Sequence, residues 1–501
     1  MKKSFYILIA SAFAVASCSK KLDQVPISSA TTATFYTQTQ DFINASNSVY
    51  NSLRGFPDRL LNLSETRSDN LYAVSDGGVR DWEGINSFHK TISSNPYVSE
   101  AWNANFNGIY KANVLLEKLA SNGSVITNAP LKLRLEAEAK FLRAFFYFDL
   151  VRYFGKVPLF DKPVTALEAL EIPRKPVSEV YALILSDLQF AAANLPDTYS
   201  AAADKGRATK WAAKGIQALV HMTRSGATYG IEGPGLGVSE WGQALTLLNE
   251  VIASTRYSFL PNYASIFSYT NENNAEVVFD VQYATGLNPV VGGTFPWVLS
   301  PDPWFQANGK IAMGGLTIRP VSNDLMNSYA VADTRKAFCI QTGYTYNGVA
   351  ETRSFFKKMV DLTKAPTNRV DWPLNFIVLR YTDILMMKAE CILRGATTGG
   401  TQADVDAIVT QVRNRAGITG TFTGITLTQL FDERRKEFAA EGLRWHDLVR
   451  SGNIETVIPA WITAEDILKQ MKSFTKDYIL YPVPQSELDI KPGLYVQNPG
   501  Y

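Results

Sequence analysis

The chain has 501 residues, of which 46% are hydrophobic and 12% aromatic, so it holds enough apolar material for a large core and more than one packing unit. Its 49 Lys and Arg nearly balance its 47 Asp and Glu, and removing residues 1–17, which include Lys2 and Lys3, makes the two counts equal. This balance argues against a nucleic-acid binder, which needs clustered cations, and against a polyanion as the main partner.

The first 34 residues have the features of an exported and anchored chain. Lys2 and Lys3 precede an apolar stretch, residues 5–15, that is too short to span a bilayer, and small residues lead up to Cys18. The pattern resembles the acylation site of bacterial lipoproteins, with residues 1–17 as signal peptide and Cys18 as the lipidated first residue of the mature chain. Residues 18–34 then form a polar tether. The alternative is an ordinary secretory signal with a chance cysteine.

Helical periodicity dominates residues 35–275 and predicts helical hairpins stacked in the manner of tetratricopeptide solenoids, although no clean sequence repeat is present. Within residues 131–154, apolar side chains recur at steps of three and four from Leu135 to Leu150, and Gly155 is well placed to end that helix. The predicted helices cover residues 41–53, 101–119, 131–154, 177–195, 209–223 and 241–253.

The composition and the periodicity of the sequence change at residue 276. Residues 277–283 alternate like a strand, and residues 284–372 are rich in Gly, Pro, Asn and aromatic residues without sustained helical periodicity. We therefore expect residues 276–375 to be a loop-rich, ligand-binding region. Helical patterns return in the C-terminal region, residues 376–501, at 376–393, 404–415 and 428–441. The predicted fold is mainly α, with a tetratricopeptide-like scaffold, one irregular region and few short strands.

Several motifs, in order along the mature chain, resemble the SusD/RagB family of nutrient-binding outer-membrane lipoproteins. They are LDQVP at 22–26, EAEAKFLRAFFYFDLVRYFGKVPL at 136–159, RYTDILMMKAE at 380–390, VRNRAG at 412–417, ERRKE at 433–437, EGLRWHDL at 441–448, YPVPQSE at 481–487 and QNPGY at 497–501. Two stretches depart from the family pattern: residues 491–493, and residues 284–372, which match no motif.

The resemblance implies a non-enzymatic, lipid-anchored protein of the outer membrane, exposed at the cell surface. It would capture oligosaccharides or polysaccharides and pass them to its partner, a SusC-like TonB-dependent transporter. A peptide-capturing relative of the RagB type is the nearest alternative. A surface glycosidase would need two carboxylates across a cleft, and the sequence nominates no such pair. A purely structural lipoprotein would need no exposed aromatic platform.

A neutral sugar presents a flat C–H face and hydroxyl groups, so its site needs exposed aromatic rings beside short polar side chains. Two stretches between predicted helices, near residues 69–82 and 295–308, supply both. For each aromatic residue, a role as a core anchor beneath a loop is an equally open alternative. The candidates are Trp82 and Trp297 first, then Tyr72 and Trp304 for stacking, with Asn70 and Asn308 as hydroxyl partners.

A cluster of charged residues near the C-terminus is interpreted as a structural ion-pair network, because arginines beside the carboxylates lower their pKa and so disfavour general-acid chemistry. The sequence predicts no metal or cofactor, since it contains neither HExxH nor CxxC. Cys339 and Cys391 remain open between a disulfide and two free thiols. The network residues are Glu433, Arg434, Arg435, Glu437, Glu441, Arg444 and Asp447.

Overall fold

The computed structural model describes residues 35–73, 78–396 and 398–501. Three predictions from the sequence lie outside the described residues: the signal peptide at 1–17, the lipidation of Cys18 and the tether at 18–34. The prediction of three regions, 35–275, 276–375 and 376–501, stays a prediction.

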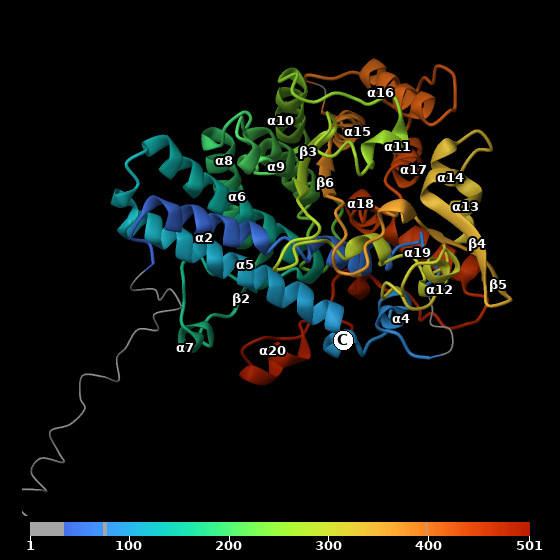
Figure 1. The fold of residues 1–501 in the computed structure, drawn as a ribbon, viewed down its shortest axis with the longest axis horizontal. Helices are drawn as coiled ribbons and strands as arrows, with labels where there is room; N and C mark the ends of the chain where they lie inside the picture. The colour runs from blue at the N-terminus through green and yellow to red at the C-terminus, as the bar shows by residue number, and fades with distance from the viewer. Residues whose placement is uncertain (1–34, 74–77, 397) are drawn as a thin grey trace, which may run out of the picture.

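Long helices pack side by side in chain order, each one against the helix before it and the helix after it (Figure 1). They are α2 (Thr39–Asn51), α5 (Pro96–Ser121), α6 (Ala129–Phe154), α8 (Val177–Asn194), α9 (Lys210–Arg224), α10 (Trp241–Ala253), α15 (Tyr381–Leu393) and α16 (Gln402–Arg415). Because α10 packs directly on α15, the residues between them are an insertion into the stack. The prediction of a mainly α, tetratricopeptide-like fold is confirmed.

Helix α6 lies at the centre of this stack, in contact with both α5 and α8. From Phe141 to its end at Phe154 every side chain is buried. The helix begins at a cap, where the Asn128 side chain accepts a hydrogen bond from Leu131 N. It ends at Gly155, whose φ of 65° is in the region that favours glycine, as the sequence predicts.

Two strands join the insertion to the helical stack. Strand β3 (Val277–Val281) pairs antiparallel with β6 (Phe376–Arg380), which leads directly into α15. The prediction of a helix from residue 376 is therefore wrong for its first five residues. A short apolar run fits a buried strand and a buried helix equally well, and pairing with β3 decides between them. A further short pair joins β1 (Val157–Pro158) to β2 (Arg174–Lys175).

The insertion holds more regular structure than its composition predicts. Strands β4 (Ile340–Tyr346) and β5 (Val349–Phe356) form a hairpin whose turn, Asn347-Gly348, has φ values of 49° and 77°. Asn-Gly is the favoured sequence for such a two-residue turn. The hairpin lies at the edge of the molecule beside four short helices, the right-hand side of Figure 1. These are α11 (Tyr263–Ile266), α12 (Asp302–Ala307), α13 (Asn323–Ser328) and α14 (Thr334–Cys339).

Helix α17 (Leu427–Glu437) ends earlier than the sequence predicts, at Glu437 rather than at residue 441. The chain turns through Ala440 and Gly442, which have φ values of 64° and 77°. This turn directs the amides of both residues to the buried carboxylate of Glu65, at 3.0 and 2.9 Å. The contact to a distant carboxylate, which local periodicity does not encode, sets the end of the helix.

The remaining helices are short and surround this framework. They are α3 (Phe56–Leu60), the π-helical turn Leu61–Glu65, α4 (Asp81–Asn86), α7 (Ala166–Ala169), α18 (Arg444–Ser451), α19 (Ile454–Glu465) and α20 (Gln485–Ile490). Within the described ranges, no helix combines the length and the apolar character that crossing a bilayer requires.

Candidate ligand-binding site

The first stretch proposed from the sequence, residues 69–82, lies against residues 319–321, which follow the second stretch in the chain. Leu71 forms a β-bridge with Val321, and Tyr72 N donates to Pro320 O at 2.8 Å. The Arg319 guanidinium lies over the Trp82 ring, 4.2 Å from its centroid. Helices α4 and α12 accordingly lie on the same side of the molecule (Figure 1).

Two of the six candidates face inward rather than outward. Trp82 is 2% exposed and Asn70 is fully buried. The Asn70 amide donates to Glu65 Oε1 and accepts from Arg435 Nε, at 2.9 and 2.8 Å. These side chains hold the scaffold together and present no face to a sugar, so the expectation that they contact a ligand is corrected here. The core-anchor alternative describes them better.

Tyr72 and Trp297 are half-buried and fixed by hydrogen bonds. The Tyr72 hydroxyl donates to Asp466 Oδ1 at 2.8 Å. The Trp297 indole donates to Arg369 O at 2.8 Å, and its ring lies close to Gly314, where a Cβ atom would come within 3.0 Å of Cη2. Trp297 thus keeps part of its ring exposed in a fixed orientation, which suits stacking.

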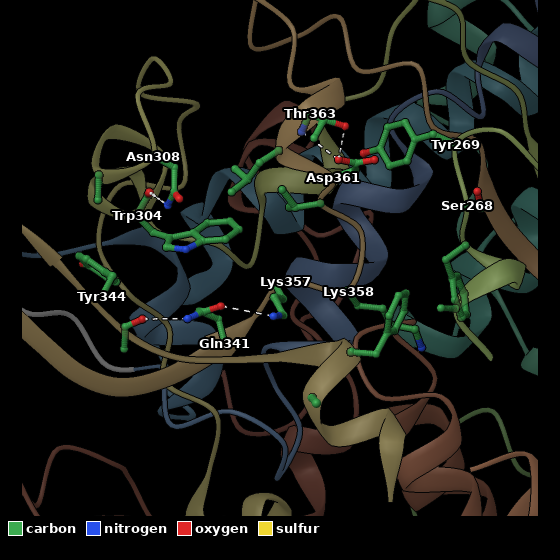
Figure 2. Close-up of a pocket in the computed structure, with 18 of the residues that line it drawn as sticks. Ser268, Tyr269, Trp304, Asn308, Gln341, Tyr344, Lys357, Lys358, Asp361 and Thr363 are labelled. Carbon is green, nitrogen blue, oxygen red and sulfur yellow. Dashed lines mark hydrogen bonds between the residues drawn. The ribbon is translucent and has the colours of Figure 1, made fainter. Parts of the chain in front are cut away.

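Trp304 and Asn308 open onto a cavity of about 790 Å³ between α12 and the β4–β5 hairpin. Trp304 is 6% exposed, and Asn308 is exposed and donates to Trp304 O at 2.8 Å. Figure 2 shows both among the side chains that line the cavity. This volume falls in the range of small-molecule sites.

Aromatic side chains from three segments form the walls of the cavity: Tyr269, Trp304 and Tyr344. Phe355, fully buried on β5, packs edge-on against Trp304 and Tyr344, with ring centroids 5.2 and 6.0 Å away. One buried ring therefore sets the orientation of two walls. Burial raises the pKa of the Tyr344 and Tyr269 hydroxyls, so both stay neutral at physiological pH.

The polar groups of the cavity lie on two sides, as Figure 2 shows. On one side Lys357 Nζ donates to Gln341 Oε1 at 3.3 Å. On the other, Asp361 Oδ1 accepts from Thr363 N and Oγ1, at 2.8 and 2.7 Å. A site that combines aromatic walls with amide, ammonium and carboxylate groups can bind a polyhydroxylated ring.

Sequence reasoning missed Tyr344, Gln341, Lys357 and Asp361 as site residues. They converge only because β4 and β5 fold into a hairpin over the loop that carries Tyr269. The Asn347-Gly348 pair was the available signal, since it predicts a hairpin at this point. Tyr269 lies before β3 and carries no sequence signal that links it to this region.

The seven charged residues near the C-terminus all take part in ion pairs. Glu437 contacts Arg335, Arg380 and Arg415, at 3.0, 2.8 and 2.6 Å. Burial by itself raises the pKa of Glu437, and the three arginines more than offset this, holding it well below its usual range. The other pairs join Glu433 to Arg335, Glu441 to Arg380, Arg434 to Asp383 and Asp447, and Arg435 and Arg444 to Asp69.

Cys339 and Cys391 are each buried and are not joined in a disulfide. Over the described part of the chain, no group of three or more His, Cys, Asp or Glu side chains is arranged to hold a metal ion.

Two family models match this chain. Residues 302–501 match the model of the SusD family, and residues 22–222 match a model described as starch-binding, associating with the outer membrane. The chain belongs to the SusD/RagB family.

Among curated relatives, SusD-like protein P25 of Formosa agariphila is 27% identical over 451 residues, which cover 81% of this chain and 80% of the relative. A solved laminarin-binding SusD-like protein is 25% identical with a TM-score of 0.75, covering 93% of this chain and all of that one. Surface glycan-binding protein A of Bacteroides thetaiotaomicron, solved with laminarihexaose, has a TM-score of 0.78 at 23% identity, with the same coverage.

Proposed function

We propose that this protein captures oligosaccharides or polysaccharides at the outer surface of the outer membrane by reversible binding, without turnover, and passes them to a SusC-like TonB-dependent transporter. The observation that carries glycan capture is the cavity between α12 and the β4–β5 hairpin, where Trp304, Tyr344 and Tyr269 surround amide and charged groups. The names of its relatives, which include a starch-binding and a laminarin-binding protein, support the same ligand class.

Capture needs only a rigid surface that a sugar ring can cover. Trp297 and Trp304 lie on the same segment, and both are held in place, by the Arg369 carbonyl and by Phe355 respectively. Rings fixed in this way lose little conformational freedom on binding, which favours affinity. We therefore place the ligand on Trp297, Trp304 and Asn308, extending into the cavity.

Isothermal titration of the purified protein against a panel of glycans and peptides tests this proposal. We expect saturable binding of at least one oligosaccharide and no release of reducing ends over a long incubation. Binding of peptides alone would replace the proposal with peptide capture. Cleavage of a bound glycan would replace it with glycosidase activity.

Anchoring and hand-off rest on the sequence of the N-terminus and on the family. Acyl chains on Cys18 would hold the protein on a bilayer without a spanning helix, since burial contributes about 0.8 kcal/mol per methylene. Mass spectrometry of the mature N-terminus tests this, and Cys18→Ser should release the protein from the membrane fraction. Co-purification of the barrel transporter with the tagged protein tests the partner.

A further inference from the structure

Lys357 is a half-buried cation that lines the cavity and forms no ion pair with any residue that the structure describes. Within the described ranges its ammonium has one hydrogen bond, to the neutral amide oxygen of Gln341 at 3.3 Å, and no carboxylate within ion-pair distance. Its neighbour Lys358 differs, because it is buried and pairs with Glu441 at 2.6 Å. One unpaired positive charge therefore faces the cavity.

The carboxylate that faces Lys357 across the cavity does not form an ion pair with it. Asp361 lies across the cavity from Lys357, beside Tyr269 (Figure 2). Its Oδ1 atom accepts both hydrogen bonds from Thr363, whereas Oδ2 has no partner in the described part of the chain. Oδ2 can accept a hydrogen bond from a hydroxyl group. The cavity thus has a cationic side and a hydroxyl-accepting side, with aromatic walls between them.

Resting on the proposed glycan capture, we propose that this cavity selects an acidic sugar residue. Its carboxylate or sulfate ester pairs with Lys357, its ring packs between Trp304 and Tyr344, and its hydroxyl groups donate to Asp361. A charge-assisted hydrogen bond is about twice as strong as a neutral one. Selectivity for an acidic over a neutral sugar then comes from one short-range ion pair with Lys357. This is compatible with the balanced charge of the whole chain, because a short-range contact needs no long-range attraction of a polyanion.

The test compares acidic and neutral forms of the same sugars. Isothermal titration uses trimers of galacturonate, mannuronate and sulfated galactose, each beside its methyl-esterified or desulfated counterpart. The proteins are the wild type, Lys357→Met, Lys357→Arg and the matched control Lys364→Met. Lys364 is exposed, lies seven positions further along the chain and does not line the cavity.

We expect the wild type to bind at least one acidic trimer about tenfold or more tightly than its neutral counterpart. Lys357→Met should abolish this preference with an unchanged thermal midpoint, and Lys357→Arg should retain it. Lys364→Met should behave like the wild type. The acidic trimer whose affinity falls in Lys357→Met shows whether the cavity binds a carboxylate or a sulfate ester.

Equal binding of acidic and neutral forms, or a preference that survives Lys357→Met, overturns the acidic-sugar proposal and leaves glycan capture intact. Binding of acidic peptides in place of every glycan overturns both. If Lys357→Met unfolds, Lys357→Arg and the salt dependence of wild-type binding decide the question, because an ion pair weakens as salt rises and a neutral contact does not.

Discussion

The Arg319 guanidinium lies 4.2 Å from the ring centroid of Trp82, so helix α4 and the segment between α12 and α13 are joined by a cation–π contact. Trp82 is 2% exposed and belongs to the main hydrophobic core of the protein. A residue that the sequence offers as a sugar-stacking candidate is therefore a core residue.

Trp82→Ala should destabilise the protein without acting on ligand contacts directly. Removing a buried indole leaves a cavity, which costs about 3–5 kcal/mol in free energy of unfolding. Urea denaturation checks this. Trp297→Ala, at a half-buried ring, is the control and should cost far less. A loss below about 1 kcal/mol for Trp82→Ala would contradict the structural role.

Trp297→Ala and Tyr344→Ala locate the ligand. Tyr344 is half-buried on β4 and lines the cavity, whereas Trp297 lies outside it, against Gly314. We expect Tyr344→Ala to weaken glycan binding about tenfold or more, since loss of an aromatic stacking partner costs about 1–3 kcal/mol. Titration of both variants measures this. If Trp297→Ala weakens glycan binding and Tyr344→Ala does not, the ligand binds on the outer surface rather than in the cavity.

Asp69 should make stability depend on pH in acid. Burial raises its pKa, but Arg435 and Arg444 more than reverse this and lower it from 3.8 to about 2. A lowered folded-state pKa contributes stability above pH 4 that is lost as pH falls towards 2, here about 2 kcal/mol. Urea denaturation between pH 7 and 2 should show this loss for the wild type. Asp69→Asn should have lower stability at pH 7 and lack this part of the slope.

Gly155→Ala should destabilise the end of α6. The residue has φ of 65°, and a Cβ atom there would lie 2.3 Å from Glu232 O. We expect a loss of about 2 kcal/mol or more from strain and clash together. Gly242→Ala is the control, because Gly242 lies in α10 with open space around it and Ala favours a helix by up to about 1 kcal/mol. Equal midpoints for both variants would show that Gly155 is not constrained.

The helices of the stack could be predicted from the sequence because their apolar periodicity is local. Helix α6 illustrates this, since the sequence predicts it at 131–154 and the structure has it at Ala129–Phe154. The site could not be predicted to the same extent. Trp82 and Trp297 are both aromatic residues in stretches without sustained periodicity, and tertiary packing, such as the Arg319 guanidinium over Trp82, determines which ring is buried.

The predicted bounds of two helices are wrong for a related physical reason. Residues 376–380 become a strand because β3 offers them a partner about a hundred positions earlier. Helix α17 stops at Glu437 because Glu65 accepts the amides of Ala440 and Gly442. In both places the free energy of a long-range contact outweighs local helical propensity.

The hydrogen bonds from Ala440 and Gly442 to Glu65 close loops of 375 and 377 residues. A buried carboxylate near the start of the described chain has the Asn70 amide as a local partner, but receives these two backbone donors only when most of the polypeptide has been synthesised. Until then the packing around Glu65 is incomplete, because a buried carboxyl group that lacks hydrogen-bond donors is costly. The chain should consequently remain open to proteases and chaperones until its last hundred residues have emerged, and should then close in one late, cooperative step.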